Sequence, residues 1–129
     1  MPALPRTALR PVFAALLAAA LPAFAAPESS VMVTPPLVAD GASVLDCYIT
    51  NVSGSERVVR IEALTRDGAL AANPIDLSLL PFTEKVLTTP AEALARFCRF
   101  TVEGRPHQFR ASILVREAGR GSISALAAQ

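Results

Sequence analysis

The sequence contains no tryptophan, one histidine and two cysteines. A zinc site needs three or four ligands, and His107 is the only histidine that could join the cysteines, so we expect no metal site. A Ser-His-Asp arrangement would depend on His107 as its base, and no Gly-x-Ser-x-Gly motif marks a partner serine. We therefore predict no catalytic residue, no metal ligand and no cofactor.

Neither sign of charge is in excess. The chain has 12 basic and 11 acidic residues, and removal of residues 1–25 would take Arg6 and Arg10 with it, leaving 10 basic against 11 acidic residues and a net charge of −1. General binding to nucleic acid or to a membrane surface calls for a basic excess. We therefore expect no nucleic-acid partner.

The first 25 residues have the three parts of a secretory signal peptide. A short segment with Arg6 and Arg10 and no acid precedes an unbroken apolar run at 12–21, and Ala23-Phe24-Ala25 follows Pro22. Ten apolar residues cover only about 15 Å as a helix, against a hydrocarbon core of about 30 Å, so a transmembrane anchor is not favoured. We predict a signal peptide at 1–25 and a single mature domain at 26–129.

The mature chain is a series of short segments in which apolar and polar residues alternate, which is typical of half-buried strands. The predicted strands are 31–33 (resumed at 37–39), 43–52, 57–64, 75–80, 83–89, 96–103, 108–117 and 122–128. Residues 69–74 have no clear pattern, and proline followed by Ala, Glu and Leu at 90–95 favours one helical turn that bridges two sheets. This pattern predicts an all-β, antiparallel sandwich of seven to eight strands.

The two cysteines lie in the middle of two of these segments, Cys47 in 43–52 and Cys98 in 96–103. In an oxidising compartment two cysteines most simply form a structural disulfide. A reactive pair would favour Cys-x-x-Cys spacing, whereas these are 51 positions apart. We therefore predict a Cys47–Cys98 bridge with a structural role.

A cysteine on the second strand, another about 50 residues later and the segment 90–98 leading into it resemble an immunoglobulin-like domain. The resemblance implies that the two cysteine strands lie in opposite sheets and that the bridge crosses the core. The chain departs from the antibody-type pattern, because Val59 or Ile61 stands in the region of the core tryptophan and Arg96 stands at the position of the corner tyrosine. The Cys-x-x-x-Asn and Phe-Cys-Arg-Phe strands also resemble a loose class of small exported bacterial proteins without an assigned activity.

Arginines are concentrated at outward positions of the predicted strands. If 96–103 and 108–117 form a hairpin, Arg99, Arg110 and Arg116 share one outer face, and Arg60 joins them if its strand is the next neighbour. Guanidinium groups suit phosphate or carboxylate, so these arginines with Phe97 form a candidate ligand or partner surface. The alternative is an ordinary exposed face with carboxylates of neighbouring strands as partners.

Other outward positions carry apolar and acidic side chains. With Phe97, Tyr48 and Leu114 would form an apolar patch suited to a protein partner. A flat sheet surface offers no cleft that would shift carboxyl pKa values, so we expect the outward acids to be solvated. These acids are Asp46, Glu62, Asp76 and Glu103.

Together these features predict an exported, periplasmic or extracellular, non-enzymatic domain with a binding or structural role in the cell envelope. The predicted partner is another envelope protein or an anionic envelope component, and no stable membrane span remains after cleavage. Two alternatives stay open: a binder of an anionic small molecule or glycolipid through the arginine face, and, favoured least, a hydrolase.

The signal peptide can be tested directly. Cleavage is expected after Ala25, with Ala26 as the second choice, because small residues stand at the spacing that signal peptidase recognises. N-terminal sequencing of the protein recovered from its native host should begin at Ala26 or Pro27. An intact Met1 on the bulk of the folded protein would contradict the prediction.

Overall fold

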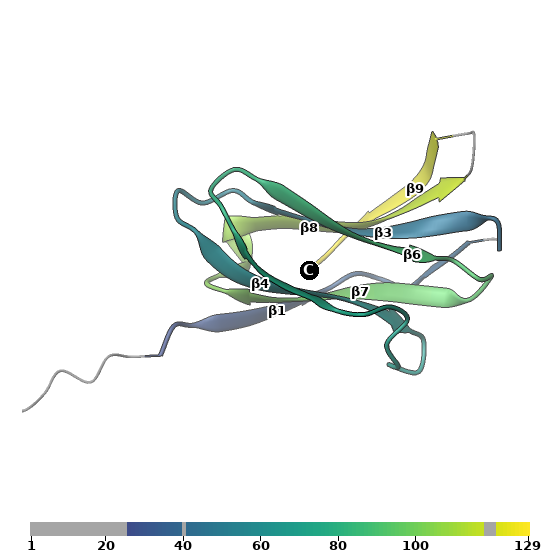
Figure 1. Ribbon diagram of the computed structural model, residues 1–129, viewed down its shortest axis with the longest axis horizontal. Helices are drawn as coiled ribbons and strands as arrows, with labels where there is room; N and C mark the ends of the chain where they lie inside the picture. The colour runs from purple at the N-terminus through teal and green to yellow at the C-terminus, as the bar shows by residue number, and fades with distance from the viewer. Residues whose placement is uncertain (1–25, 40, 118–120) are drawn as a thin grey trace, which may run out of the picture.

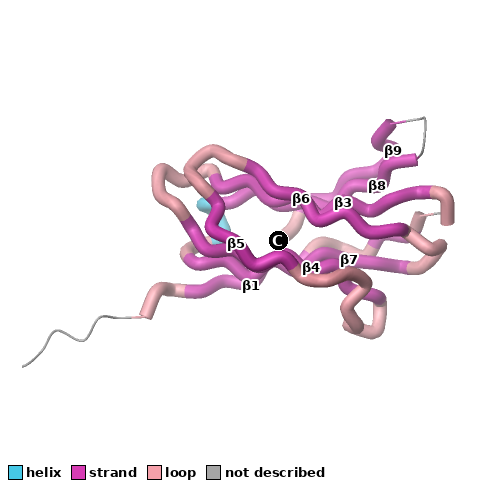
Figure 2. Tube along the Cα trace, in the orientation of Figure 1, coloured by secondary structure: helices cyan, strands magenta, loops and turns pink. Residues whose placement is uncertain are grey.

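The computed structural model describes residues 26–39, 41–117 and 121–129, and Figure 1 shows two layers of strands packed face to face. The predicted signal peptide lies outside the described residues. In Figure 2 nearly all of the described chain is strand or loop. Within the described part, no helix is long and apolar enough to cross a membrane. The prediction of an all-β, antiparallel fold is therefore confirmed.

The strands form two sheets, here called sheet A and sheet B. Sheet A has the order β1-β7-β4-β5, with β2 also paired to β7, and sheet B has the order β6-β3-β8-β9. The bounds in sheet A are β1 Ser29–Val33, β2 Leu37–Val38, β4 Arg57–Thr65, β5 Ile75–Leu79 and β7 Ala95–Glu103. The bounds in sheet B are β3 Ser43–Asn51, β6 Glu84–Pro90, β8 Phe109–Glu117 and β9 Gly121–Ala127. A last strand near 122–128 is thus present, whereas 69–74 contributes only an isolated bridge between Leu64 and Leu70.

The core lies between the sheets and is built from the inward positions of the central strands. Each of these side chains is at most 2% exposed: Leu45, Cys47, Ile49, Val59, Ile61, Ala63, Cys98, Phe100, Val102, Ile113 and Val115. Full burial of one large aliphatic or aromatic side chain stabilises the fold by about 1.5–3 kcal/mol. The alternation in the sequence predicted the inward positions of the two cysteine strands and of β4 and β8.

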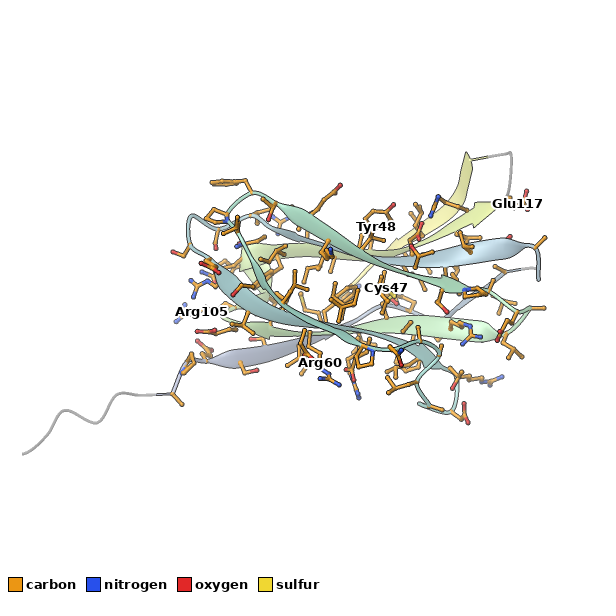
Figure 3. All side chains as sticks on the ribbon, viewed as in Figure 1. Cys47, Tyr48, Arg60, Arg105 and Glu117 are labelled. Carbon is orange, nitrogen blue, oxygen red and sulfur yellow. A yellow bond between two sulfur atoms is a disulfide. The ribbon has the colours of Figure 1, made fainter. Side chains whose placement is uncertain are left out.

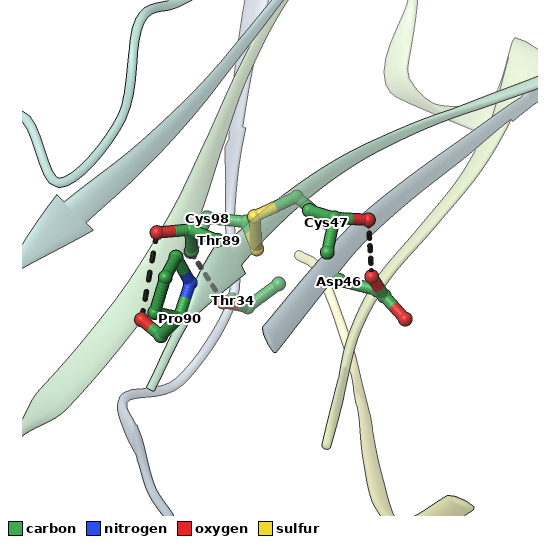
Figure 4. Close-up of a disulfide and its surroundings, with 7 residues drawn as sticks. Thr34, Asp46, Cys47, Thr89, Pro90 and Cys98 are labelled. Atoms are coloured by element: carbon green, nitrogen blue, oxygen red, sulfur yellow. Dashed lines mark hydrogen bonds between the residues drawn. A yellow bond between two sulfur atoms is a disulfide. The ribbon is translucent and has the colours of Figure 1, made fainter. Parts of the chain in front are cut away.

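The disulfide joins the two sheets through their interior. Cys47 on β3 and Cys98 on β7 are bonded at 2.04 Å, with Cα atoms 5.7 Å apart. Thr34, which directly follows β1, is hydrogen-bonded to the backbone of Cys98. The Cys98 N–H donates to Thr34 Oγ1 at 2.9 Å, and the Thr34 N–H donates to the Cys98 carbonyl at 3.0 Å. Figure 4 shows the bridge and the first of these bonds. The predicted inter-sheet bridge is confirmed.

The strand pairing separates β7 from β8. The pairs β3–β6 and β4–β7 are compatible with the central pairs of the immunoglobulin plan, but β1 occupies the free side of β7, and β8 pairs with β3 over nine residues. The short 3₁₀ turn η1 (Pro106–Gln108) lies in the connection between the two sheets. The hairpin on which the arginine face depended does not form.

The connection between β6 and β7 also differs from the prediction. Residues 91–94 form a β-turn in which Glu92 and Ala93 have φ of 53° and 54°, closed by the Leu94 N–H donating to the Ala91 carbonyl at 3.3 Å. Left-handed φ at both central residues excludes the predicted right-handed helical turn. The segment does join the two sheets, as expected.

The side chain of Arg96 secures this turn. Its side chain is only 3% exposed, its Nε donates to the Ala91 carbonyl at 3.3 Å, and a terminal nitrogen donates to Glu92 Oε2 at 2.5 Å. A buried charged side chain therefore stabilises the β6–β7 turn, and both of its partners belong to that turn.

The disulfide should dominate the stability of this domain. Replacing both cysteines (Cys47→Ala with Cys98→Ala) should lower the free energy of unfolding by about 4 kcal/mol, because the bridge closes a loop with a separation of 51 residues. Urea denaturation under non-reducing conditions measures the loss. Reductant should destabilise the wild type to a similar extent and leave the double variant unchanged; a wild type insensitive to full reduction would contradict the prediction.

Candidate functional site

The structure divides the predicted arginine face between two sheets. Arg60 and Arg99 lie on the outer face of sheet A, whereas Arg110 and Arg116 lie on β8 in sheet B. Figure 3 shows Arg60 pointing away from the sandwich on the sheet A side and Tyr48 pointing away on the sheet B side. The four arginines therefore do not form one surface. The strands β7 and β8 belong to opposite sheets, and the outer faces of these sheets point in opposite directions.

On sheet A the arginines belong to an ion-pair network centred on Glu62. The strand register places Glu62 of β4 opposite Arg99 of β7, and Arg60 of β4 opposite Asp76 of β5. Arg99 donates to both Glu62 oxygens, at 2.6 and 2.9 Å, and Arg60 Nε lies 3.4 Å from Glu62 Oε1. Arg60 also donates to both oxygens of Asp76, at 2.8 and 3.1 Å. The network contains two positive and two negative side chains.

The network buries one carboxylate under its partners. The Glu62 side chain is 6% exposed, against 44% for Arg99 and 41% for Arg60, so the prediction that Glu62 is solvated is wrong. The hydrogen bonds from Arg99 lower the pKa of Glu62 below its ordinary value, against the opposing effect of burial. Both guanidinium groups are therefore paired with carboxylates of this chain.

Apolar side chains surround this network on the same face. Val31 and Val33 of β1 and Val58 of β4 occupy outward positions and are 56%, 39% and 53% exposed. Phe97 of β7 lies opposite Leu64 of β4, where Leu64 is almost fully buried and Phe97 is half-buried. We call this surface the sheet A outer face, defined by Val31, Val33, Val58, Phe97, Arg60, Glu62, Asp76 and Arg99.

The sheet B outer face has a second buried carboxylate. Asp46 occupies an outward position of β3 yet is fully buried, because Arg116 of β8 forms an ion pair with it and Thr88 of β6 donates to its Oδ1 at 2.6 Å. The prediction that Asp46 is solvated is therefore wrong. Arg110 donates to the carbonyls of His107 and Phe109, at 3.2 and 2.8 Å. Arg116 is therefore ion-paired, whereas Arg110 is exposed and uses one terminal nitrogen for both carbonyls.

The predicted apolar patch of Phe97, Tyr48 and Leu114 does not exist as one surface. Phe97 lies on sheet A, whereas Tyr48 and Leu114 lie on β3 and β8 of sheet B. The strand alternation assigned each side chain to an outer face correctly, but it could not distinguish the two outer faces of a sandwich.

His107 lies exposed on η1, at the edge of an open groove of about 620 Å³ beside the start of β8. The groove is also lined by Tyr48, Glu84 and Arg110. Among the described residues, no group of three or more His, Cys, Asp or Glu side chains is arranged to hold a metal ion.

Burial of Glu62 leads to a pH-dependent prediction. Glu62→Gln should lower the free energy of unfolding by about 1–3 kcal/mol at neutral pH, because Arg99 loses a charged acceptor in a mostly buried site. Since the pKa of Glu62 is lowered in the folded state, its contribution is complete above its ordinary pKa of 4.5 and is lost as pH falls through the folded-state value.

Urea denaturation of wild type and variant between neutral and acidic pH measures this effect. The gap between them should close in acid. Asp76→Asn is the matched control, because Asp76 is 61% exposed, and its removal should change stability by less than about 0.5 kcal/mol. Equal effects of the two substitutions would show that Glu62 is not the centre of the network.

Comparison with known proteins gives information on the fold alone. No protein-family model matches the chain, and no curated protein matches its sequence. A solved structure titled "Crystal Structure of Thermotoga maritima 1070" superposes with a TM-score of 0.52 at 12% sequence identity, over 77% of this chain and 91% of the Thermotoga maritima chain. At this identity the likeness shows a similar fold and carries no information on function.

Proposed function

We propose that this protein is exported, loses its signal peptide, and serves in the cell envelope as a non-enzymatic β-sandwich of immunoglobulin-like plan that binds another protein through the sheet A outer face. The disulfide supports export, because structural disulfides persist in oxidising compartments. The central pairs β3–β6 and β4–β7, with a bridge between them, support the immunoglobulin-like plan.

The distribution of exposed apolar side chains carries the proposal. Among the described side chains, every large hydrophobic residue that is exposed on a strand belongs to sheet A: Val31, Val33, Val38 and Val58. The other exposed ones, Leu70, Leu80, Phe82 and Leu94, lie in connections. Exposed apolar residues gathered on one face, next to polar groups that already have partners, are typical of protein-binding surfaces.

The charges on this face favour a protein over an anionic polymer or glycolipid. Arg60 and Arg99 are balanced by Glu62 and Asp76, so the network has no net charge. A network without net charge attracts an anion only weakly at long range. Its carboxylates and guanidinium groups can form hydrogen bonds with a protein at the rim of an interface. The balance of charges therefore favours a protein partner for this face over the anionic-ligand alternative.

Cross-linking in envelope extract tests the proposal. The wild-type domain should yield a discrete cross-linked species with an envelope protein, and Val31→Glu combined with Val58→Glu should reduce it at least about tenfold, because the new carboxylates would have to lose their hydration in the interface. Leu80→Glu is the matched control, since Leu80 is equally exposed but lies in the β5–β6 connection. Failure of the wild type to retain any partner, or equal retention by both variants, would refute this function.

A further inference from the structure

Arg57, the first residue of β4, occupies the inward register at one end of the sandwich. The inward residues that follow it on β4 are Val59, Ile61 and Ala63, all buried in the core. Continuing the pairing of Val59 with Val102 by two residues places Arg57 opposite Gly104. The Nε atom of Arg57 is buried, and it is the one buried side-chain nitrogen or oxygen in the described part of the chain that has no hydrogen-bond partner.

Six of the other described arginines form ion pairs or hydrogen bonds within the chain. Carboxylates pair with Arg60, Arg96, Arg99, Arg105 and Arg116, and Arg110 donates to two carbonyls. Arg66 has no such partner but is exposed in the β4–β5 connection. Arg57 is half-buried and forms no hydrogen bond or ion pair within the described residues. A partly desolvated cation without a partner is unfavourable unless a ligand or water satisfies it.

Arg57 lines a pocket of about 300 Å³ beside Gly104. Gly104 has φ of 118°, a conformation that residues with a side chain rarely adopt, and a Cβ at this position would clash with Gln108 Oε1. The glycine is itself fixed, because its N–H donates to the Glu28 carbonyl at 2.7 Å and its carbonyl accepts from Ser30 Oγ at 2.7 Å. These two hydrogen bonds hold the β7–β8 connection against the residues before β1 and against β1 at the wall of the pocket.

Two carboxylates, Glu28 and Glu103, also line the pocket, and neither forms an ion pair with Arg57. Glu28 is engaged by Arg105, whose Nε lies 3.3 Å from its carboxylate. Glu103 belongs to the outward register of β7 and forms no ion pair with Arg57. Gln108 Oε1 accepts the Arg105 N–H at 2.9 Å, and His107 completes the wall on the exposed side.

We propose that this pocket is a binding site for an oxyanion, a carboxylate or a phosphate group, held by the guanidinium group of Arg57. A guanidinium group presents a planar fork that matches both oxyanions, and partial burial strengthens the resulting charge-assisted hydrogen bonds. The site is separate from the sheet A outer face, so it does not depend on the function proposed for that face.

Titration with two probe anions tests the site. Inorganic phosphate and acetate are added separately to isotopically labelled protein with the disulfide intact, at constant ionic strength, and the amide resonances of Gly104, Arg105 and Gln108 are followed by NMR. At least one anion should shift these resonances saturably in the millimolar range. Arg57→Gln should weaken the response at least about tenfold, because the charged donor is lost.

Arg66→Gln is the matched control and should leave the titration unchanged, since it removes an equal charge from the β4–β5 connection. Arg57→Lys keeps the charge without the fork and should bind with intermediate affinity, which also covers the case in which Arg57→Gln does not fold. Saturation by phosphate alone assigns a phosphoryl ligand, and saturation by acetate alone assigns a carboxylate. Linear shifts with both anions, or equal responses of Arg57→Gln and Arg66→Gln, would overturn the proposal.

Discussion

The covalent link between Cys47 and Cys98 is the constraint on which both sheets depend. It joins β3 and β7, and each of these strands has neighbours on both sides, so the bridge connects the centres of the two layers. Thr34 binds both backbone groups of Cys98 and thereby fixes the segment between β1 and β2 to the same point. With the layers held face to face, their outer faces are the two broad surfaces left for contact with other molecules.

The sequence predicted which residues face inward but not which strands are neighbours. Alternation assigns Phe100 and Val102 to the interior whether β7 pairs with β8 or with β1, because both pairings keep the same period of two. The choice depends on contacts between segments far apart in the chain, such as Ser29 with Glu103 and Asn51 with Phe109. The sandwich and its disulfide were therefore predictable, whereas the combined arginine surface was not.

The same limit explains the two buried carboxylates. Alternation places Asp46 and Glu62 outward, which is correct, but outward is not the same as solvated when a neighbouring strand carries an arginine at the matching position. Once β8 is known to pair with β3 and β7 with β4, Arg116 falls near Asp46 and Arg99 falls opposite Glu62. Charged partners across strands convert candidate ligand-binding arginines into structural ones, which changes the expected chemistry of the surface.

Two arginines at inward positions near opposite ends of β7 show how local backbone decides the state of a buried cation. Arg96 lies at the start of β7, where the left-handed turn of Glu92 and Ala93 brings a carbonyl and a carboxylate to its guanidinium group. Arg57 lies beside the end of β7, where the left-handed residue is Gly104, which provides no acceptor for the Arg57 side chain. Both ends therefore admit an arginine between the sheets. At one end Glu92 supplies the negative charge for Arg96. At the other end no group of the described chain pairs with Arg57, and a bound anion would take that place.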